Sequence, residues 1–215
     1  MLKTLLLVSF LVSSALANPA PLGSVRLGAR NAAGQLDTLV TTKMKYTGPI
    51  TPGGEDVELS GTAEDVYNQI VHLNPSYDPA AFGNNATDIA PPLSKRDKSG
   101  LICNIGRHAQ VGRIWQGISY LKSLPGGGTC GIDAGPAHCV RISCSWDSGI
   151  FLCNDNPWPI APNCAYLATY AEDIVLSCPY SDECQPGAAA FCNEFVNGQR
   201  FDTDNYNVIV GWSGC

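Results

Sequence analysis

The sequence predicts an α+β fold in which an antiparallel sheet carries two helices on one face and disulfides hold the layers together. Strand-like and helix-like patterns follow one another along residues 97–215 in the order β-α-β-β-α-β. Each helix-like pattern has a single apolar stripe, as expected for a helix that packs on a sheet. All 10 cysteines of the 215-residue chain lie after residue 102, a density typical of a disulfide scaffold.

The first two elements are a short strand and an amphipathic helix. Residues 101–105 form an apolar run that Gly106 ends. Within residues 108–124, apolar side chains recur at intervals of three and four, which predicts a helix. Its expected apolar stripe consists of Val111, Ile114, Trp115, Ile118 and Leu121. Pro125 and the three glycines after it end this helix.

The next pattern, at residues 138–154, predicts a β-hairpin with a turn at Asp147-Ser148-Gly149. Alternation in HCVRISCSW places Val140, Ile142 and Cys144 toward the helices. It places Arg141 and Ser143 on the opposite, solvated face. These two residues and Trp146, beside the turn, are the candidate contacts to a partner, although a packed core position is the simpler interpretation of Trp146.

A second helix and a final pair of strands complete the pattern. Asn163 is the expected N-cap of a helix that runs to Cys178 and is closed by Pro179. Cys164 and Cys178 lie on its apolar stripe, which suggests disulfides from this helix into the sheet. Residues 198–201 and 206–212 predict strands around a turn at 202–205. The complete order predicts a split βαβ, ferredoxin-like sandwich.

The cysteines predict a framework of five disulfides without a free thiol, whose connectivity the sequence leaves open. Metal binding is a weaker interpretation because the chain has no CxxC pair and only two of its three histidines lie in this region. We therefore expect no metal and no cofactor. The ten positions are Cys103, Cys130, Cys139, Cys144, Cys153, Cys164, Cys178, Cys184, Cys192 and Cys215.

Residues 1–17 have the pattern of a secretory signal peptide. Lys3 precedes an apolar run, and Ala15-Leu16-Ala17 provides a small-x-small cleavage motif, so cleavage is expected after Ala17. The apolar run is too short to span a bilayer. The sequence therefore predicts a secreted, extracellular protein without a transmembrane segment.

Lys95 and Arg96 are the only adjacent basic pair of the chain, and they follow two prolines that keep the backbone extended. An exposed dibasic pair in a secretory protein suits a kexin-type protease. We therefore expect residues 18–96 to be a propeptide and residues 97–215 the mature cysteine-rich domain. The alternative is an uncut basic linker.

The expected propeptide is largely irregular, with one helix at residues 62–73 that Thr62 caps and Asp65 supports. Asn85-Ala86-Thr87 is a glycosylation sequon. Three roles remain open for the propeptide: to assist folding, to hold the product inactive, or to carry it through secretion.

The charge of the expected mature domain restricts its partners. Residues 97–215 contain six Lys and Arg against eleven Asp and Glu, a net charge of −5. This charge argues against nucleic acid or an anionic membrane as an electrostatic partner. We expect a monomer that meets its target outside the cell.

The stretches LICNIG, HCVRISCSWDSGIFLCNDN and DNYNVIVGWSGC, behind a dibasic processing site, resemble small cysteine-rich secreted proteins of fungi. These are candidate effectors, some of them grouped with the killer toxins of smut fungi. The resemblance covers about residues 100–215. It implies a compact α/β sandwich and a non-enzymatic toxin or effector that acts on a host or competitor. It assigns no active residue to this chain.

Two other classes of function stay open. A secreted ribonuclease would use two histidines, His108 and His138, or one histidine with Glu194 and an arginine as acid and base. However, no motif of known spacing links these residues, so we assign no catalytic residue. A carbohydrate- or wall-binding module is the third hypothesis. The Asp/Asn clusters at 147–149, 154–156 and 202–205 are better explained by Asx turns than by Ca²⁺ binding.

Overall fold

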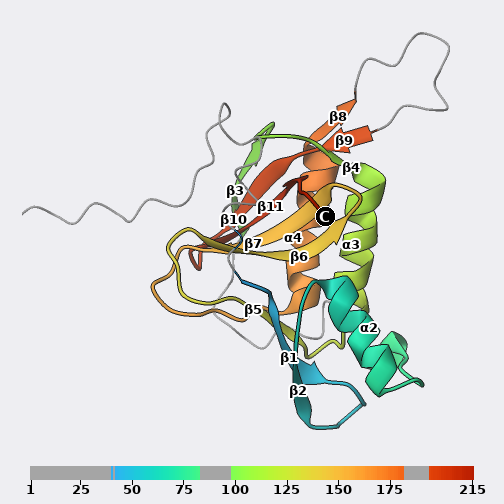
Figure 1. Ribbon diagram of the computed structural model, residues 1–215. Coiled ribbons are helices and arrows are strands. Elements are labelled where there is room, and N and C mark those ends of the chain that lie inside the picture. Colours follow the sequence, from blue (N-terminus) through green and yellow to red (C-terminus); the bar gives the residue numbers. More distant parts are fainter. Residues whose placement is uncertain (1–39, 41, 83–97, 182–193) are drawn as a thin grey trace, which may run out of the picture.

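The computed structural model describes residues 40, 42–82, 98–181 and 194–215 (Figure 1). Within these ranges the protein is α+β, with α-helices and antiparallel sheets, as predicted. Several predicted features lie outside the described residues. They are the signal peptide with Ala17, the sequon at Asn85, the Lys95-Arg96 pair, Cys184 and Cys192.

The main sheet has five strands in the order β3-β10-β11-β7-β6, and every neighbouring pair is antiparallel. Helices α3 (Val111–Ser123) and α4 (Cys164–Ser177) pack side by side against one of its faces (Figure 1). The strands are β3 (Lys98–Cys103), β6 (His138–Ser145), β7 (Ser148–Asn154), β10 (Gly198–Asp202) and β11 (Tyr206–Trp212).

The four-strand ferredoxin-like order is not confirmed. In that order, the first strand lies in the centre of the sheet, whereas β3 lies at an edge and pairs only with β10. The last two strands form a complete hairpin, β10–β11, that fits between β3 and β7. The two helical crossovers therefore each connect parallel strands, but β3 and β6 are separated by three strands and β7 and β10 by one.

Local sequence explains where the helices begin. Asn163 caps α4 by accepting a hydrogen bond from the backbone N–H of Tyr166 at 2.9 Å. Helix α3 buries Ile114, Ile118 and Leu121, as its stripe predicts. Trp115 was expected on that stripe, but it is 39% exposed, because it lies beside Ile114 on the solvent side of the helix.

A β-bulge in β6 corrects the predicted faces of the hairpin. The register with β7 shifts between Arg141, which pairs with Phe151, and Ser143, which pairs with Ile150. Val140 and Ile142 face the helices as predicted, but after the extra residue Ser143 also faces them and Cys144 does not. The predictions for Ser143 and Cys144 were therefore wrong, since a shift of one residue exchanges the faces.

Residues 42–82 are structured, which corrects the prediction of a largely irregular propeptide over this range. We call residues 42–82 the cover segment. It contains a hairpin, the helix predicted at 62–73 and one short 3₁₀ turn, and it packs at one end of the cysteine-rich domain (Figure 1). The elements are β1 (Lys45–Pro49), β2 (Asp56–Ser60), α2 (Ala63–Leu73) and η1 (Pro79–Phe82).

Helix α2 begins with the predicted capping box. The backbone N–H of Asp65 donates to the hydroxyl of Thr62, and the backbone N–H of Thr62 donates to the Asp65 carboxylate. The glycine before the cap, Gly61, has a φ of 138°, a conformation that only glycine adopts readily. These residues turn the chain from β2 into α2 and direct Val66 and Ile70 inward.

The core lies between the sheet and the helices, and the cover segment contributes to it. Met44, Tyr46, Val66 and Ile70 belong to the same buried cluster as Ile114, Leu152, Leu167 and Val208. A second cluster lies on the other face of the sheet, where the sequence predicts a solvated surface. It consists of Ile105, Cys139, Phe151, Cys153 and Ile209.

Among the described residues, four disulfides connect the elements of the cysteine-rich domain. Two of them join α4 and its C-cap to strands, Cys130–Cys164 and Cys103–Cys178, which confirms the prediction from the apolar stripe. Cys139–Cys153 crosslinks β6 to β7, and Cys144–Cys215 attaches the C-terminus. None of these bonds reaches the cover segment, which contains no cysteine.

We expect a fifth disulfide between Cys184 and Cys192, because these are the two cysteines that the four bonds leave over. Thiol labelling of the secreted protein in denaturant without reductant should then modify no cysteine. Labelling of two thiols per chain would contradict the prediction and revive a reactive-cysteine interpretation.

A small second sheet connects the ends of the main elements. It contains β4 (Ala109–Gln110), β9 (Glu194–Val196) and β8 (Pro179–Ser181), in the order β4-β9-β8. A third strand also joins the hairpin of the cover segment, because β5 (Thr129–Gly131) pairs with β1. In the described part of the chain, no helix is long and apolar enough to cross a membrane.

Candidate partner-binding site

Strand β5 of the cysteine-rich domain is where the cover segment docks through its backbone. Thr47 pairs antiparallel with Thr129, Tyr46 with Cys130 and Lys45 with Gly131. The other side of β5 is already occupied, since the backbone of Cys130 and Ile132 bonds to Pro162 and Ile160. Strand β1 therefore satisfies the one edge of β5 that would otherwise be open.

Tyr46 fits a seat that a glycine of the cysteine-rich domain leaves open. The side chain is fully buried, and a Cβ added to Gly128 would lie 2.5 Å from Tyr46 Cε2 and 2.7 Å from its hydroxyl oxygen. The neighbouring Gly127 has open space at the same position. Gly128 is therefore specifically fitted to the aromatic ring, and burial raises the pKa of the Tyr46 phenol.

Helix α2 adds an apolar contact to α3 and β6. Met44, Val66 and Ile70 are each fully buried, and burying such a side chain contributes about 1.5–3 kcal/mol. Tyr67 packs edge-on against Tyr120 of α3, with ring centroids 5.5 Å apart. The apolar part of the interface thus resembles a protein core rather than a surface contact.

Polar contacts surround this apolar centre. The Tyr77 hydroxyl donates to the carbonyl of Ser123 at 2.6 Å, at the end of α3. The Lys45 ammonium donates to Asp133 at 2.6 Å, and this contact lowers the pKa of the Asp133 carboxyl. The Lys45 side chain is 63% exposed and that of Asp133 is 43% exposed. An ion pair this accessible to water contributes little to affinity, so its main effect is to favour this register of β1 against β5.

Glu64 of the cover segment reaches Ser143, one of the three candidate partner contacts. The Ser143 hydroxyl donates to Glu64 Oε1, and Ser143 is only 2% exposed. The second carboxylate oxygen, Oε2, is buried without a hydrogen-bond partner among the described residues. Burial therefore raises the pKa of Glu64, since the charged form is poorly solvated there.

This carboxyl predicts how docking depends on pH. The pKa of Glu64 is higher in the docked segment than in the free segment. Docking is therefore strongest at a pH below the ordinary pKa of glutamate, and it weakens as the pH rises through the raised pKa of the docked state. Asp65, Lys43 and Arg141 line the adjacent cleft, and His138 and Asp133 also face this interface. A Glu64→Gln variant isolates the contribution of Glu64.

We expect Glu64→Gln to dock more tightly than the wild-type segment at pH 7 and about equally at pH 4. The measurement is the dissociation constant of the segment from protein cut within residues 83–97, across this pH range. Glu58→Gln, a change at an exposed carboxylate of β2, is the matched control and should follow the wild type. Equal affinities of Glu64→Gln and wild type at pH 7 would contradict the assignment.

Arg141, the second candidate contact, lies at the rim of the cover segment. Its guanidinium donates to the carbonyl of Gly214 at 2.6 Å and to the hydroxyl of Ser213 at 3.3 Å, so it holds the C-terminal tail. It also lines a cleft of about 530 Å³ between the cysteine-rich domain and the cover segment. The cleft is lined by Val40, Thr42, Lys43, Gly61, Thr62, Asp65, Arg141, Cys144, Gly214 and Cys215.

Trp146, the third candidate, is 72% exposed at the tip of the β6–β7 hairpin. The turn is the two-residue pair Trp146-Asp147, with φ values of 48° and 57°, rather than the predicted Asp147-Ser148-Gly149. A tryptophan rarely adopts positive φ. Arg113 of α3 stacks over its ring at 5.0 Å. An exposed, strained aromatic of this kind is a candidate for contact with a ligand.

The two histidines of the ribonuclease hypothesis lie apart. His138 pairs with Asn154 at the end of β7. His108 stacks on Tyr180 and precedes Gln110, whose backbone N–H bonds to Ser148 at the start of β7. Six residues of extended strand span about 20 Å. The structure therefore does not bring these histidines together as an acid–base pair.

The Asp/Asn clusters form Asx turns at two of the three predicted places. Asn154 accepts from the backbone of Asn156 at 2.9 Å, and Asp202 accepts from the backbone of Asp204 at 2.7 Å. Within the described ranges, no group of three or more His, Cys, Asp or Glu is arranged to hold a metal ion.

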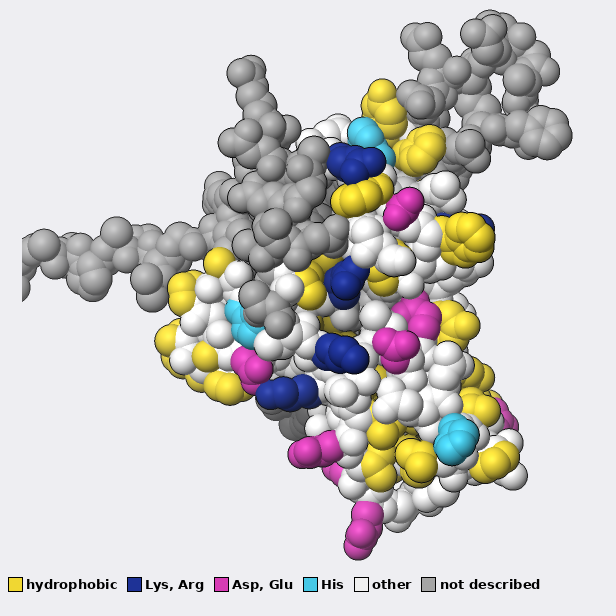
Figure 2. All heavy atoms as spheres, viewed as in Figure 1, with side chains coloured by type: hydrophobic (Ala, Val, Ile, Leu, Met, Phe, Trp, Pro, Cys, Tyr) yellow, Lys and Arg dark blue, Asp and Glu magenta, His cyan; other side chains and the backbone are white. Residues whose placement is uncertain are grey.

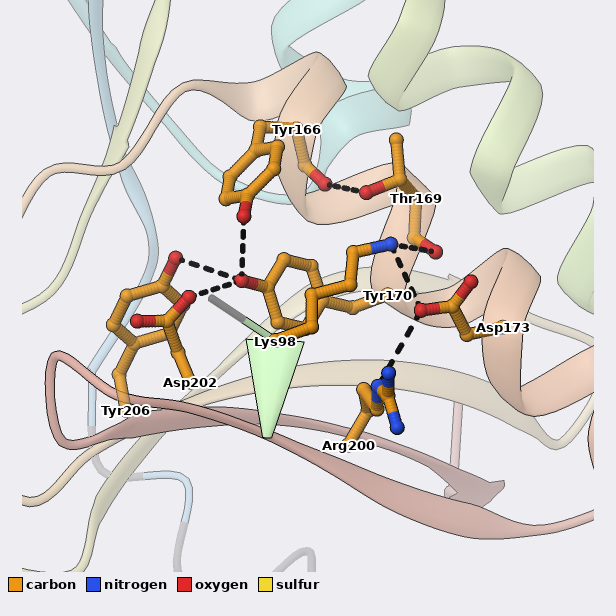
Figure 3. A network of polar contacts seen from close by, with 8 residues as sticks. All are labelled: Lys98, Tyr166, Thr169, Tyr170, Asp173, Arg200, Asp202 and Tyr206. Carbon is orange, nitrogen blue, oxygen red and sulfur yellow. Dashed lines mark hydrogen bonds and ion pairs between the residues drawn. The ribbon is translucent and has the colours of Figure 1, made fainter. Parts of the chain in front are cut away.

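A buried network of tyrosines fixes the start of the cysteine-rich domain (Figure 3). The Tyr170 hydroxyl donates to Asp202 and lies 3.0 Å from that of Tyr166 and 3.4 Å from that of Tyr206. Burial raises the pKa of Tyr170 and Tyr206, so both phenols remain protonated donors rather than bases.

Lys98, the first residue of this domain in the described part, is held by the same network. Its ammonium donates to Asp173 at 2.8 Å and to the Thr169 carbonyl at 3.0 Å, and it lies 4.9 Å from the centre of the Tyr170 ring (Figure 3). Arg200 shares the Asp173 carboxylate. We interpret the network as an anchor that holds residue 98 in place, whatever happens to the chain before it.

Charged side chains do not gather by sign on the face drawn in Figure 2, where basic and acidic groups are interspersed. Such a face provides no extended field for a polyanion.

The chain matches no known protein family, curated protein or solved structure. The interface under the cover segment is the site that the sequence analysis missed. The alternation of Met44 and Tyr46 could have indicated a buried strand there, but not the strand with which it pairs.

Proposed function

We propose that this chain is the precursor of a secreted, disulfide-stabilised effector or killer-toxin-like protein that acts outside the cell on a host or competitor. Its working part is residues 97–215, and it acts by binding rather than by catalysis. Cleavage after Arg96 breaks its covalent link to residues 18–96, which then leave it by dissociation.

The distribution of the disulfides carries this proposal. The four bonds connect β3, β5, β6, β7, α4 and the C-terminus, but none connects the cover segment. A framework of this kind suits an oxidising, extracellular environment. A single cut between the two parts therefore leaves two chains without a covalent link.

The test is to purify the secreted protein and apply it to plant tissue and to competing fungi. Its cysteine-rich chain should begin at Asp97 by intact mass under denaturing conditions. It should cause cell death or growth arrest, and reduced and alkylated protein should not. RNA cleavage that is lost in His138→Ala, without either response, would support a ribonuclease instead.

A carbohydrate- or wall-binding module is the second candidate, and one observation favours it. Trp146 and Trp158 are both more than half exposed. Exposed tryptophans offer an apolar face with a polar edge, as binding surfaces often do. Retention on chitin or glucan, reduced in Trp146→Ala and Trp158→Ala, would support this function.

A further inference from the structure

The structure assigns a second binding mode to the cysteine-rich domain: once the cover segment leaves, β5 accepts an extended protein segment with a basic–aromatic pair. This inference deepens the proposed function and rests on it for the identity of the working part. The partner replaces β1 by adding a strand antiparallel to β5. It places its aromatic side chain in the Gly128 seat and its basic side chain next to Asp133.

The template for this partner is β1 itself. Addition of a strand to an open sheet edge supplies backbone hydrogen bonds, while pockets for alternate side chains supply selectivity. Tyr46 of β1 and Met44, the residue just before this strand, are the alternate side chains that enter the domain, and both are fully buried. Lys45 points to the opposite side and meets Asp133. The cysteine-rich domain therefore recognises a short Lys-Tyr-Thr strand through the side chains at two adjacent positions, the lysine and the tyrosine.

The disulfides form while the precursor is folded, and they explain why this edge then persists after its cover has left. Cys130–Cys164 fixes the middle of β5 to the first residue of α4. The backbone bonds from Cys130 and Ile132 to residues 160–162 hold the opposite side of the strand. Removal of β1 then exposes an edge whose position is already set, which favours binding of a new strand.

The buried Glu64 carboxylate weakens docking of the cover segment and so favours its dissociation. Its Oε1 accepts a hydrogen bond from Ser143, whereas its Oε2 is buried without a hydrogen-bond partner among the described residues. A partner strand on β5 needs no carboxylate at this place. It can therefore replace the cover segment without the unfavourable burial that α2 introduces.

The test uses the full chain, cut after folding by a protease specific for Lys-Arg pairs. The probe is a fluorescent peptide of residues 42–60. We expect the peptide to bind the cut protein as the bound segment exchanges, and a peptide with Tyr46→Ala to bind at least tenfold more weakly. Failure of the wild-type peptide to bind, or equal binding of both peptides, would overturn the inference.

Two neighbouring glycines provide the matched control in the protein. Gly128→Ala should reduce binding of the wild-type peptide at least tenfold, and Gly127→Ala should leave it unchanged, since of these two glycines Gly128 alone lies against Tyr46. If Gly128→Ala fails to fold, the Tyr46→Ala peptide still decides the question. A loss of equal size in both glycine variants would count against the seat.

A locked form separates this inference from the proposed function. Thr47 and Thr129 are directly opposed, and residues so placed have Cα atoms about 4.5–5.5 Å apart, which a disulfide can bridge. The variant Thr47→Cys/Thr129→Cys should retain the cover after the cut and bind no peptide. The control variant Thr47→Ser/Thr129→Ser should lose the cover and bind the peptide.

If the locked form acts on tissue as strongly as its control, β5 is not the working edge. If neither acts but the control exchanges peptide, the proposed function fails and the β5 site stands.

Discussion

A chain that lacks residues 42–82 is expected to be secreted at least about tenfold less well than the full precursor. The deletion removes Met44, Tyr46, Val66 and Ile70 from the main core. Loss of even one such contact, about 1.5–3 kcal/mol, corresponds to tenfold or more in a folding equilibrium. The total stability of a domain is only about 5–15 kcal/mol. The deleted chain should therefore remain in the cell, unfolded and incompletely oxidised.

Two measurements decide whether folding is the cause. Co-expression of residues 1–96 as a separate chain should restore secretion of the deleted form, because the cover segment docks without a covalent bond. In the full precursor, Val66→Asp should reduce secretion, since it buries an unpaired carboxylate in α2. Leu73→Asp is the matched control, since Leu73 is 55% exposed on the same helix. Normal secretion of the deleted form with native disulfides would contradict the expectation.

Ile142→Asp is the single substitution with the largest expected effect. Ile142 occupies the bulge of β6 and is fully buried in the main core. An unpaired carboxylate at such a position costs several kcal/mol, a large part of the whole stability. We expect no secreted, folded protein from this variant, as measured by yield and by the near-ultraviolet circular dichroism of any product.

Leu176→Asp is the control for Ile142→Asp, because it introduces the same charge at a residue of α4 that is 71% exposed. Surface changes of this kind usually alter stability by less than about 0.5 kcal/mol. Secretion of Ile142→Asp at the level of Leu176→Asp would mean that β6 does not hold the position described here.

Patterns that depend on neighbours in the chain could be predicted from the sequence. Strand β11 has the predicted bounds of 206–212, because alternation over seven residues is a strong signal. The Asn163 cap and the Thr62–Asp65 capping box were equally visible, since each lies within four residues. The place of α4 above the sheet followed from its cysteines and its apolar stripe.

Features that depend on distant contacts could not be predicted. The bulge at Ile142 exchanges the faces of Ser143 and Cys144, and no residue type in HCVRISCSW specifies it. The edge position of β3 follows from its pairing with β10, about a hundred residues later. Trp115 satisfied the helical spacing, but a stripe fixes only an average direction, and this residue lies at its margin.

The cover segment shows the same limit at the level of the candidate site. Its strand β1 contains Gly48 and Pro49, residues that weaken a strand prediction, and its partner β5 has only three residues. Ser143 was predicted as an exposed contact, but it is buried under Glu64. The sequence contained both halves of this interface without a signal that pairs them.

The most direct test of the account is native mass spectrometry of the folded precursor after cleavage at Lys95-Arg96, at pH 5 and without denaturant. We predict a 1:1 complex of the two chains, which separates when the peptide of residues 42–60 is added in excess and which shows two separate masses under denaturing conditions. Immediate release of the cut segment at pH 5 without the peptide would contradict the claim that residues 42–82 are docked in the core of the cysteine-rich domain.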